Sequence, residues 1–306
     1  MKGYNTWMVA LDFTSMDDTL LAYTKFLSEV LKPNMIYFSH VNRGFEMPDS
    51  VHIHMTDLKR PDNDELQAKL ETKVGAYFSG EKETEIDCMV FEGKPKFELW
   101  RDTYAFDVDL FIAGGKKKHK GRGIIPKKFV RKSFCSVLFV PEEFPGRVEN
   151  ILVPVDFSAA SKKVLERVIN LAKSIENCTI TCLHVFDSPY SWDFVTLPFK
   201  EYIALFKEEA SKNYNDFMDG VDDKGVEIKG RLVLRELPHV ADHIKEVAED
   251  ENTDLIMMSA SGKSRFSAIV LGSETEKLVQ VEKDFPVMIL KEKSDTVKYW
   301  DLVSTF

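Results

Sequence analysis

Cysteine is scarce in this chain, with four in 306 residues: Cys88, Cys135, Cys178 and Cys182. So few thiols exclude a disulfide-held scaffold, and we expect buried structural cysteines. No run of 18 apolar residues occurs, which predicts no membrane-spanning helix. The first 12 residues lack the basic region, apolar segment and cleavage site of a secretory signal, so we expect a cytoplasmic protein.

Positive charge is also in short supply, because 41 Lys and Arg face 50 Asp and Glu, a net charge of −9. That balance argues against a dedicated binder of nucleic acids or anionic membranes. With 44% hydrophobic residues, 15 Gly and 12 Pro, the composition is that of a globular protein and disfavours disorder, collagen and coiled coil. The length suits two domains of about 150 residues.

The chain repeats itself. Residues 8–14, which read MVALDFT, resemble residues 152–158, which read LVPVDFS, at an offset of 144. The His-Val pairs at 40–41 and 184–185 share that offset, and the Asp-Leu pairs at 109–110 and 254–255 are 145 apart. These matches predict a tandem duplication, with one domain over residues 1–144 and the second over 147–306.

Apolar runs of strand length alternate with helical patterns in each copy. Near-continuous apolar strands joined by helices predict a parallel sheet covered on both faces, hence two doubly wound five-stranded α/β domains. In the second copy we expect strands at about 150–156, 179–185, 226–234, 254–259 and 286–291, and helices at about 159–174, 198–220, 238–250 and 274–282. We expect Ser158 to cap the first of these helices and Pro238 to lie in the first turn of the third.

Ligands of such sheets bind beyond the carboxyl ends of the strands, where the strand order reverses. In the second copy, Asp156 follows the first strand and a loop of small residues, 259–273, follows the fourth. Gly262 and Gly272 in this loop let backbone N–H groups approach an anion, and the helix that starts near Ser273 adds further N–H groups. A P-loop is excluded because Met257 stands where its first glycine is needed.

The residues Val-Pro-Val-Asp-x-Ser, His-Val and Gly-x9-Gly-Ser, in this order, resemble the universal stress protein family, which has tandem two-domain members. The resemblance covers both copies and implies an adenine nucleotide alpha hydrolase-like, Rossmann-like fold. It also implies that the last strands, at 136–140 and 286–291, pair between the domains as in a dimer.

The ATP-binding branch of the family implies a nucleotide site in the second domain, with Mg²⁺ as a possible companion. Adenine would lie near Val185, and the ribose on Asp156 beside Pro154 and Val155. The phosphates would lie along Gly262, Gly272, Ser273 and Thr275. Two residues depart from the family pattern: Ser259 replaces a glycine, and Glu274 brings a carboxylate toward the phosphates.

The first copy has a shorter loop, since nine positions separate Gly114 from Gly123 where the pattern needs thirteen, and Ile124 replaces the hydroxyl residue. We expect no triphosphate site there. The basic stretch at 116–122 is interpreted as a solvated loop, with attraction of an anion as the alternative.

The remaining polar groups give weaker signals. His239 and His243 lie four apart on an expected helix, and His52 and His54 share a face, but neither pair has a clear third ligand, so we expect solvated histidines and no metal site. His40 and His184 are expected to form structural hydrogen bonds. Asp156 itself could serve as a turn former instead of a ribose ligand.

Segments 42–62 and 187–198 interrupt the repeat after the second strand of each copy and could form lids, partner surfaces or core. The apolar tail at 297–303 is expected to dock on the other domain or on another chain.

The sequence thus predicts a cytoplasmic stress-response protein whose second domain binds an adenine nucleotide as a switch read by a protein partner, without catalysis beyond slow ATP hydrolysis. A nucleotide-free scaffold with both pockets decayed is the alternative, and a sensor of a lipid-like molecule is a third hypothesis. A further homodimer of the chain stays open.

Overall fold

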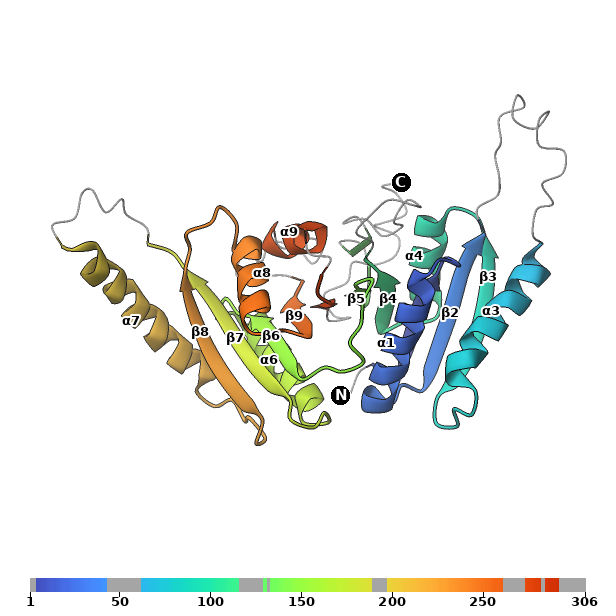
Figure 1. Cartoon of the computed structure of the whole chain (residues 1–306), viewed down its shortest axis with the longest axis horizontal. Helices are drawn as coiled ribbons and strands as arrows, with labels where there is room; N and C mark the ends of the chain where they lie inside the picture. Colours follow the sequence, from blue (N-terminus) through green and yellow to red (C-terminus); the bar gives the residue numbers. More distant parts are fainter. Residues whose placement is uncertain are drawn as a thin grey trace, which may run out of the picture.

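The computed structural model describes residues 4–42, 62–115, 129–130, 133–188, 197–260, 273–281 and 284–291. One ten-stranded sheet runs through these residues in the order β3-β2-β1-β4-β5-β10-β9-β6-β7-β8 (Figure 1). Read outward from its centre, the two halves repeat one another, since β5-β4-β1-β2-β3 is matched by β10-β9-β6-β7-β8. The expected doubly wound fold, with two five-stranded halves, is confirmed.

The strands of the first half have the following bounds: β1 Thr6–Leu11, β2 Met35–Asn42, β3 Glu85–Glu92, β4 Leu110–Gly114 and β5 Ser136–Val140. Those of the second half are β6 Asn150–Pro154, β7 Thr179–Phe186, β8 Glu227–Leu234, β9 Leu255–Ser259 and β10 Val287–Leu290.

The helices described in the first half are α1 Met16–Leu31, α3 Asn63–Phe78 and α4 Pro95–Ala105. Those of the second half are α6 Ala159–Ala172, α7 Phe199–Met218, α8 Val240–Asp250 and α9 Ser273–Val281. Ser158 is the N-cap of α6 and accepts a hydrogen bond from the backbone N–H of Ser161, as predicted. Pro238 lies outside α8, because the helix begins only after the N-cap residue His239, so its expected place in the first turn is wrong.

Within each half the strands pair in parallel, and the two halves meet through the antiparallel pair β5–β10. There Met288 lies opposite Leu138, flanked by the pairs Val287–Phe139 and Ile289–Val137. The predicted pairing of the last strands is therefore confirmed. The continuous sheet does not mark a border between two domains, so the division into 1–144 and 147–306 stays a prediction.

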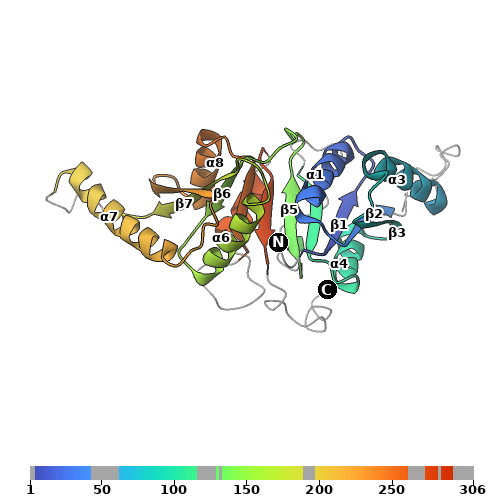
Figure 2. The same ribbon diagram turned by 90° about the horizontal axis from the view of Figure 1, so that it is seen from below.

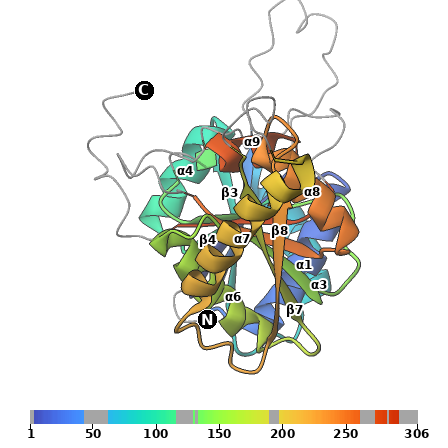
Figure 3. The same cartoon turned by 90° about the vertical axis from the view of Figure 1, so that its left-hand side faces the viewer.

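Each face of the sheet carries its own apolar core. One core joins the sheet to α1, α3, α6 and α7, and the other joins it to α4, α8 and α9. Figure 2 shows helices on both sides of the sheet, and Figure 3 looks along it from the edge formed by β8, with α7 in front. Helices on both faces explain why the strands near the centre are apolar throughout.

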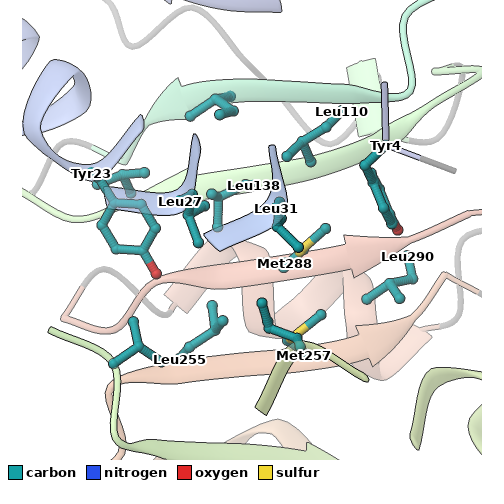
Figure 4. Close-up of a cluster of buried hydrophobic side chains, with 14 of the residues drawn as sticks. Tyr4, Tyr23, Leu27, Leu31, Leu110, Leu138, Leu255, Met257, Met288 and Leu290 are labelled. Carbon is teal, nitrogen blue, oxygen red and sulfur yellow. The ribbon is translucent and has the colours of Figure 1, made fainter. Parts of the chain in front are cut away.

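The seam between the halves is apolar along its length. Tyr23 and Leu27 of α1 lie over the strand that carries Met288, and Leu255 and Met257 of β9 lie on its other side (Figure 4). All of these residues are less than 3% exposed. Burial of this kind, at about 25 cal/mol per Å² of apolar surface, favours two halves that stay together.

Polar contacts at one end of the seam also hold the two halves together. The hydroxyl of Tyr4 lies 3.0 Å from the hydroxyl of Ser136, and Arg167 of the second half donates to the Tyr4 hydroxyl at 3.3 Å. The Ser136 hydroxyl also accepts from the backbone N–H of Lys291 at 3.0 Å. This network links the beginning of β1, the beginning of β5 and the end of β10.

Candidate functional site

The chain turns sharply at Asp156, just past the carboxyl end of β6. The Oδ1 atom of Asp156 accepts hydrogen bonds from the backbone N–H of Ser158 and from the hydroxyl of Ser161, both at 3.0 Å. Phe157 between them has a φ of +61°, a left-handed conformation that a bulky residue adopts only where its surroundings hold it. Asp156 is thus a turn former at the start of α6, the role that the sequence left open beside ribose binding.

His184 joins the ends of β6 and β7. Its Nδ1 donates to the carbonyl of Val155 at 2.8 Å, which places the ring proton on Nδ1. The ring of Phe157 covers the imidazole, with centroids 4.0 Å apart. The predicted structural role of His184 is confirmed, and it leaves the following residue, the half-buried Val185, at the same edge as Asp156.

The N-terminus of α9 lies at the end of β9. Thr275, 4% exposed, donates from Oγ1 to the carbonyl of Ser259 at 3.2 Å, while Ser273 at the start of the helix is exposed. Because β9 pairs with β6 in parallel, the register Ile151–Leu255 brings this end of β9 beside the strand that leads to Asp156. A helix N-terminus and a carboxylate therefore share one edge of the sheet.

Glu274 bonds to a neighbouring helix at this edge. Its Oε2 accepts a hydrogen bond from the backbone N–H of Ala241, in the first turn of α8, at 3.1 Å. The N-cap residue of α8, His239, makes no capping bond with its side chain. The carboxylate that the sequence placed close to a bound phosphate therefore caps a neighbouring helix.

The first half forms the same turn from its own residues. Asp12 accepts from the backbone N–H and the hydroxyl of Thr14, at 3.3 and 2.6 Å, and Phe13 has a φ of +57°. His40 donates from Nδ1 to the carbonyl of Leu11 at 2.9 Å, as His184 does to Val155. The expected structural bond of His40 is confirmed, and burial lowers its pKa.

One difference between the two turns changes the charge of this edge. At the position of Ser161, the first half holds Asp17, which is fully buried and accepts from the backbone N–H groups of Asp12 and Phe13 at 3.0 and 2.9 Å. Burial is the main cause that raises the pKa of the Asp17 carboxyl, and the charge of Asp12 adds to it. Two carboxylates at one strand end make this edge of the first half unfavourable for phosphate.

A second exchange explains how Ser259 fits at a glycine position. Its counterpart in the first half is Gly114, where an added Cβ would lie 2.6 Å from Cγ of Met16. At the offset of 144 residues, the counterpart of Met16 is Ala160. In the first half, a small strand residue, Gly114, thus packs against a large helix residue, Met16. In the second half, the strand residue Ser259 is larger and the helix residue Ala160 is smaller.

Comparisons with known proteins now identify the second half. The sequence model of the universal stress protein family matches residues 147–291. Two universal stress proteins of Methanocaldococcus jannaschii are 27% and 28% identical to this chain over 161 and 152 residues. Their alignments cover 48% and 47% of this chain, and 96% and 82% of the relatives. Residues 147–291 are a universal stress protein domain.

Solved structures extend the likeness to the whole chain. A universal stress protein of Archaeoglobus fulgidus has a TM-score of 0.61 at 15% identity and covers 94% of this chain, which covers 97% of it. A protein of unknown function from Pseudomonas aeruginosa has a TM-score of 0.66 at 12% identity, with 99% and 98% covered. Identities this low show the fold alone, and that fold agrees with the two doubly wound halves predicted from the sequence.

The histidines of α8 in this universal stress domain are not a solvated pair. His243 is 3% exposed, and its Nε2 accepts from the backbone N–H groups of Glu236 and Leu237 at 3.1 and 2.9 Å. The expectation of a solvated His243 is therefore wrong, because the ring orders the chain that leads into α8. In the described part of the chain, no three His, Cys, Asp or Glu side chains are grouped so that they could hold a metal ion.

The four thiols behave as packing groups. Cys135, Cys178 and Cys182 are buried and Cys88 is half-buried. Burial raises the pKa of Cys88 and Cys182 to about 12 and that of Cys135 and Cys178 to about 11, so each is a poor nucleophile at neutral pH. Among the helices that the structure describes, none is long and apolar enough to cross a membrane.

Several predicted features lie outside the described residues. They are Gly262 and Gly272 of the loop, the basic stretch 116–122, His52 and His54, most of the segments 42–62 and 187–198, and the tail at 297–303.

The sequence analysis missed one contact and one residue difference at the site. Nothing local to Glu274 indicates that it caps α8, whose Ala241 lies 33 residues earlier in the chain. The exchange of Ser161 for Asp17 does have a sequence signal, because the offset of 144 aligns the two positions.

Proposed function

We propose that the second half binds an adenine nucleotide, ATP in company with Mg²⁺, at the carboxyl edge of β6, β7 and β9. The observation that supports this best is the bond from Thr275 Oγ1 to the carbonyl of Ser259. It holds the N-terminus of α9 at the edge where Asp156 follows β6, so that anion-binding N–H groups and a carboxylate face one ligand.

Each proposed contact has a chemical reason. Asp156 would accept hydrogen bonds from ribose hydroxyls, while Pro154, Val155 and Val185 provide a surface for the sugar and base. The N–H groups of Ser273 and Thr275, with Gly262 and Gly272 of the preceding loop, would hold phosphates. The bond of Glu274 to Ala241 engages its carboxylate with the positive end of α8, which weakens the electrostatic objection to phosphate at α9.

The fit to Mg²⁺ depends on the nucleotide. Among the described residues no group of acidic or histidine side chains could hold a metal by itself. Mg²⁺ commonly takes most of its ligands from phosphate oxygens and water, so the cation would arrive with the nucleotide.

We propose that the first half does not bind ATP. Asp12 and Asp17 place two carboxylates at the end of β1, and the loop after β4 is shorter than its counterpart. The chain would then take one nucleotide, and binding would act as a switch that a protein partner reads in a cytoplasmic stress response. We propose binding and not catalysis, with slow ATP hydrolysis as the most that the site performs.

The two aspartates offer a matched experiment. Asp156→Asn keeps an Oδ1 acceptor for Ser158 and Ser161 but removes the charge, and Asp12→Asn makes the same change in the first half. Calorimetric titration with ATP and Mg²⁺ should give one site per chain. Asp156→Asn should weaken it at least about tenfold, since hydrogen bonds to a charged group contribute about 1.5–3 kcal/mol.

Asp12→Asn should leave the affinity unchanged. Equal weakening by both variants would contradict an assignment to the second half. No heat and no bound nucleotide up to millimolar ATP would favour the nucleotide-free scaffold, and native mass spectrometry that finds an unexpected bound mass would favour a sensor of another ligand.

A further inference from the structure

The helices α4 and α8 are counterparts in the duplication and differ on their outer faces. Both have 11 residues, and Pro95 of α4 corresponds to Val240 of α8 at the offset of 145. Leu99 and Ile244, 3% and 1% exposed, occupy equivalent positions in the core, so the two helices pack in the same register. Differences on their outer faces therefore reflect surface properties and not a rotated helix.

The outer face of α4 is aromatic where that of α8 is charged. Phe97 and Tyr104, two turns apart, are 46% and 48% exposed. Their counterparts in α8 are Asp242 and Glu249. A helix of the same fold, packed in the same way, can thus present charged residues here. Large apolar side chains gathered at an exposed position are typical of an interaction surface.

Two buried rings adjoin this face, Trp100 on α4 and Phe134 on the segment that leads into β5. The ring of Phe134 lies 5.1 Å from that of Tyr104 and 5.5 Å from that of Trp100. Between Phe97 and Tyr104, Arg101 is 43% exposed and pairs with Glu98 and Asp102 at 2.6 and 2.9 Å. We call the surface formed by Phe97, Arg101 and Tyr104 the α4 face, and the buried ring of Phe134 supports it from below Tyr104.

The described chain ends beside the α4 face. Lys291, which follows β10, donates from Nζ to the carbonyl of Ser133 at 2.8 Å and to the carbonyl of Val130. Ser133 immediately precedes Phe134, so the side chain of the last described residue is held one position from a ring that contacts Tyr104. Fifteen residues follow Lys291, and they lie outside the described part of the chain.

The composition of those residues fits the surface. They read EKSDTVKYWDLVSTF, with Tyr299, Trp300, Leu302, Val303 and Phe306 as large apolar groups and Asp301 as an acid that could face Arg101. We propose that this C-terminal segment, residues 292–306 of the same chain, docks on the α4 face. Such docking does not depend on nucleotide binding, and it would cover an aromatic surface that the counterpart helix α8 lacks.

The distances allow this. An extended chain covers about 3.3–3.6 Å per residue, so residues 292–297 span about 20 Å, while Phe97 and Tyr104 lie about 10 Å apart along their helix. A short connection to Lys291 also gives the segment a local concentration of the order of millimolar, which favours docking within one chain over binding from outside.

The test replaces the two exposed aromatic residues of α4 by the residues at the equivalent positions of α8. The variant Phe97→Asp/Tyr104→Glu copies α8, where these residues are compatible with the fold, and Asp242→Asn/Glu249→Gln is the matched control on α8. Limited trypsin treatment of the full chain, followed by mass spectrometry, measures cleavage after Lys298. We expect cleavage about tenfold faster in the α4 variant, equivalent to about 1.4 kcal/mol of lost docking, and unchanged in the control.

Equally fast cleavage in the natural chain and in the α4 variant would overturn the proposal. Cleavage that slows as the protein concentration rises would also overturn it, because the occupant would then be the segment of a second copy. Trp300→Ala provides a second readout from the other partner: hydrogen exchange of the α4 amides should speed up while those of α8 stay unchanged. Thermal melting of each variant checks that the fold is retained.

Discussion

Glu274 and Ala241 are joined by a 3.1 Å hydrogen bond from the backbone N–H of Ala241 to the Oε2 atom of the glutamate. The first turn of α8 has N–H groups without helical partners, and its N-cap residue supplies no side-chain acceptor. Glu274 of α9 supplies one from a different helix, and its negative charge lies at the positive end of the helix dipole. A residue adjacent to the candidate site therefore stabilises its neighbour.

Replacement of Glu274 by Ala should lower the stability of the protein. Loss of a capping acceptor costs about 1 kcal/mol, within a usual range of about 0.5–2 kcal/mol. Urea unfolding followed by circular dichroism measures the change. Glu208→Ala, at an exposed position of α7, is the control and should change stability by no more than about 0.5 kcal/mol. Equal effects of the two variants would show that the cap contributes nothing.

The exchange between Gly114 and Ser259 predicts a coupled pair of mutations. Gly114→Ser alone should destabilise the protein by about 1–3 kcal/mol, because its Cβ would lie 2.6 Å from Cγ of Met16. The double variant Gly114→Ser/Met16→Ala recreates the combination of the second half. It should be more stable than the sum of the single variants by at least about 0.5 kcal/mol. Strict additivity in urea unfolding of all four proteins would contradict this steric account.

The lowered pKa of Lys291 predicts that the free energy of unfolding rises in alkaline solution. Burial lowers its pKa to about 8, whereas an unfolded lysine titrates near 10.5. Between these pH values the unfolded chain binds a proton that the folded chain has released. The unfolding free energy therefore increases with pH, by at most about 1.4 kcal/mol per pH unit from this group.

Urea unfolding at pH 7.5, 8.5 and 9.5 checks this sign. The stability of the natural chain relative to Lys291→Met should increase across the series. The variant loses the bonds to Ser133 and Val130 and should be less stable throughout the series, so the trend with pH is the informative quantity. An exposed control, Lys82→Met, should show no such trend. A flat or falling difference for Lys291→Met would refute the buried position of the ammonium group.

Lys32, at the end of α1, has a left-handed backbone with a φ of +49°, while Lys173, at the end of α6, has a right-handed φ of −58°. Glycine relieves strain only at the first position. We expect Lys32→Gly to raise the melting temperature, with a gain of about 0.5–1 kcal/mol, and Lys173→Gly to lower it. The pair of Lys32 with Glu83 is exposed, so its loss should matter little. Melting changes of the same sign in both variants would contradict the strain argument.

Much of the fold could be predicted because it depends on order along the chain. The duplication and the parallel pairing follow from repeated motifs and apolar runs, and the family resemblance implied the contact between the last strands; each is present in the sheet. The predicted start of α8 was too early, because Pro238 precedes the N-cap residue His239 and does not enter the helix. Local propensity indicated a helix here but not its first residue.

The candidate site was predictable only in outline. Its strand ends and its helix start follow from the motif around Asp156 and from the position of Ser273. Side-chain directions did not follow, as His243 illustrates: its place on a polar helix suggested a solvated ring, yet it is buried against the N–H groups of Glu236 and Leu237. A helical pattern indicates a face, whereas burial depends on which segment packs against that face.

By itself, the sequence determined that this protein is a duplicated doubly wound α/β chain, with its candidate nucleotide site at the carboxyl ends of the second set of strands. Periodicity and chain order carry that information, since they fix which strands can be neighbours. Only the tertiary structure decided that Glu274 caps α8 and that Lys291 binds the carbonyl of Ser133. These contacts join residues 33 and 158 positions apart, and packing in three dimensions alone brings them within hydrogen-bond distance.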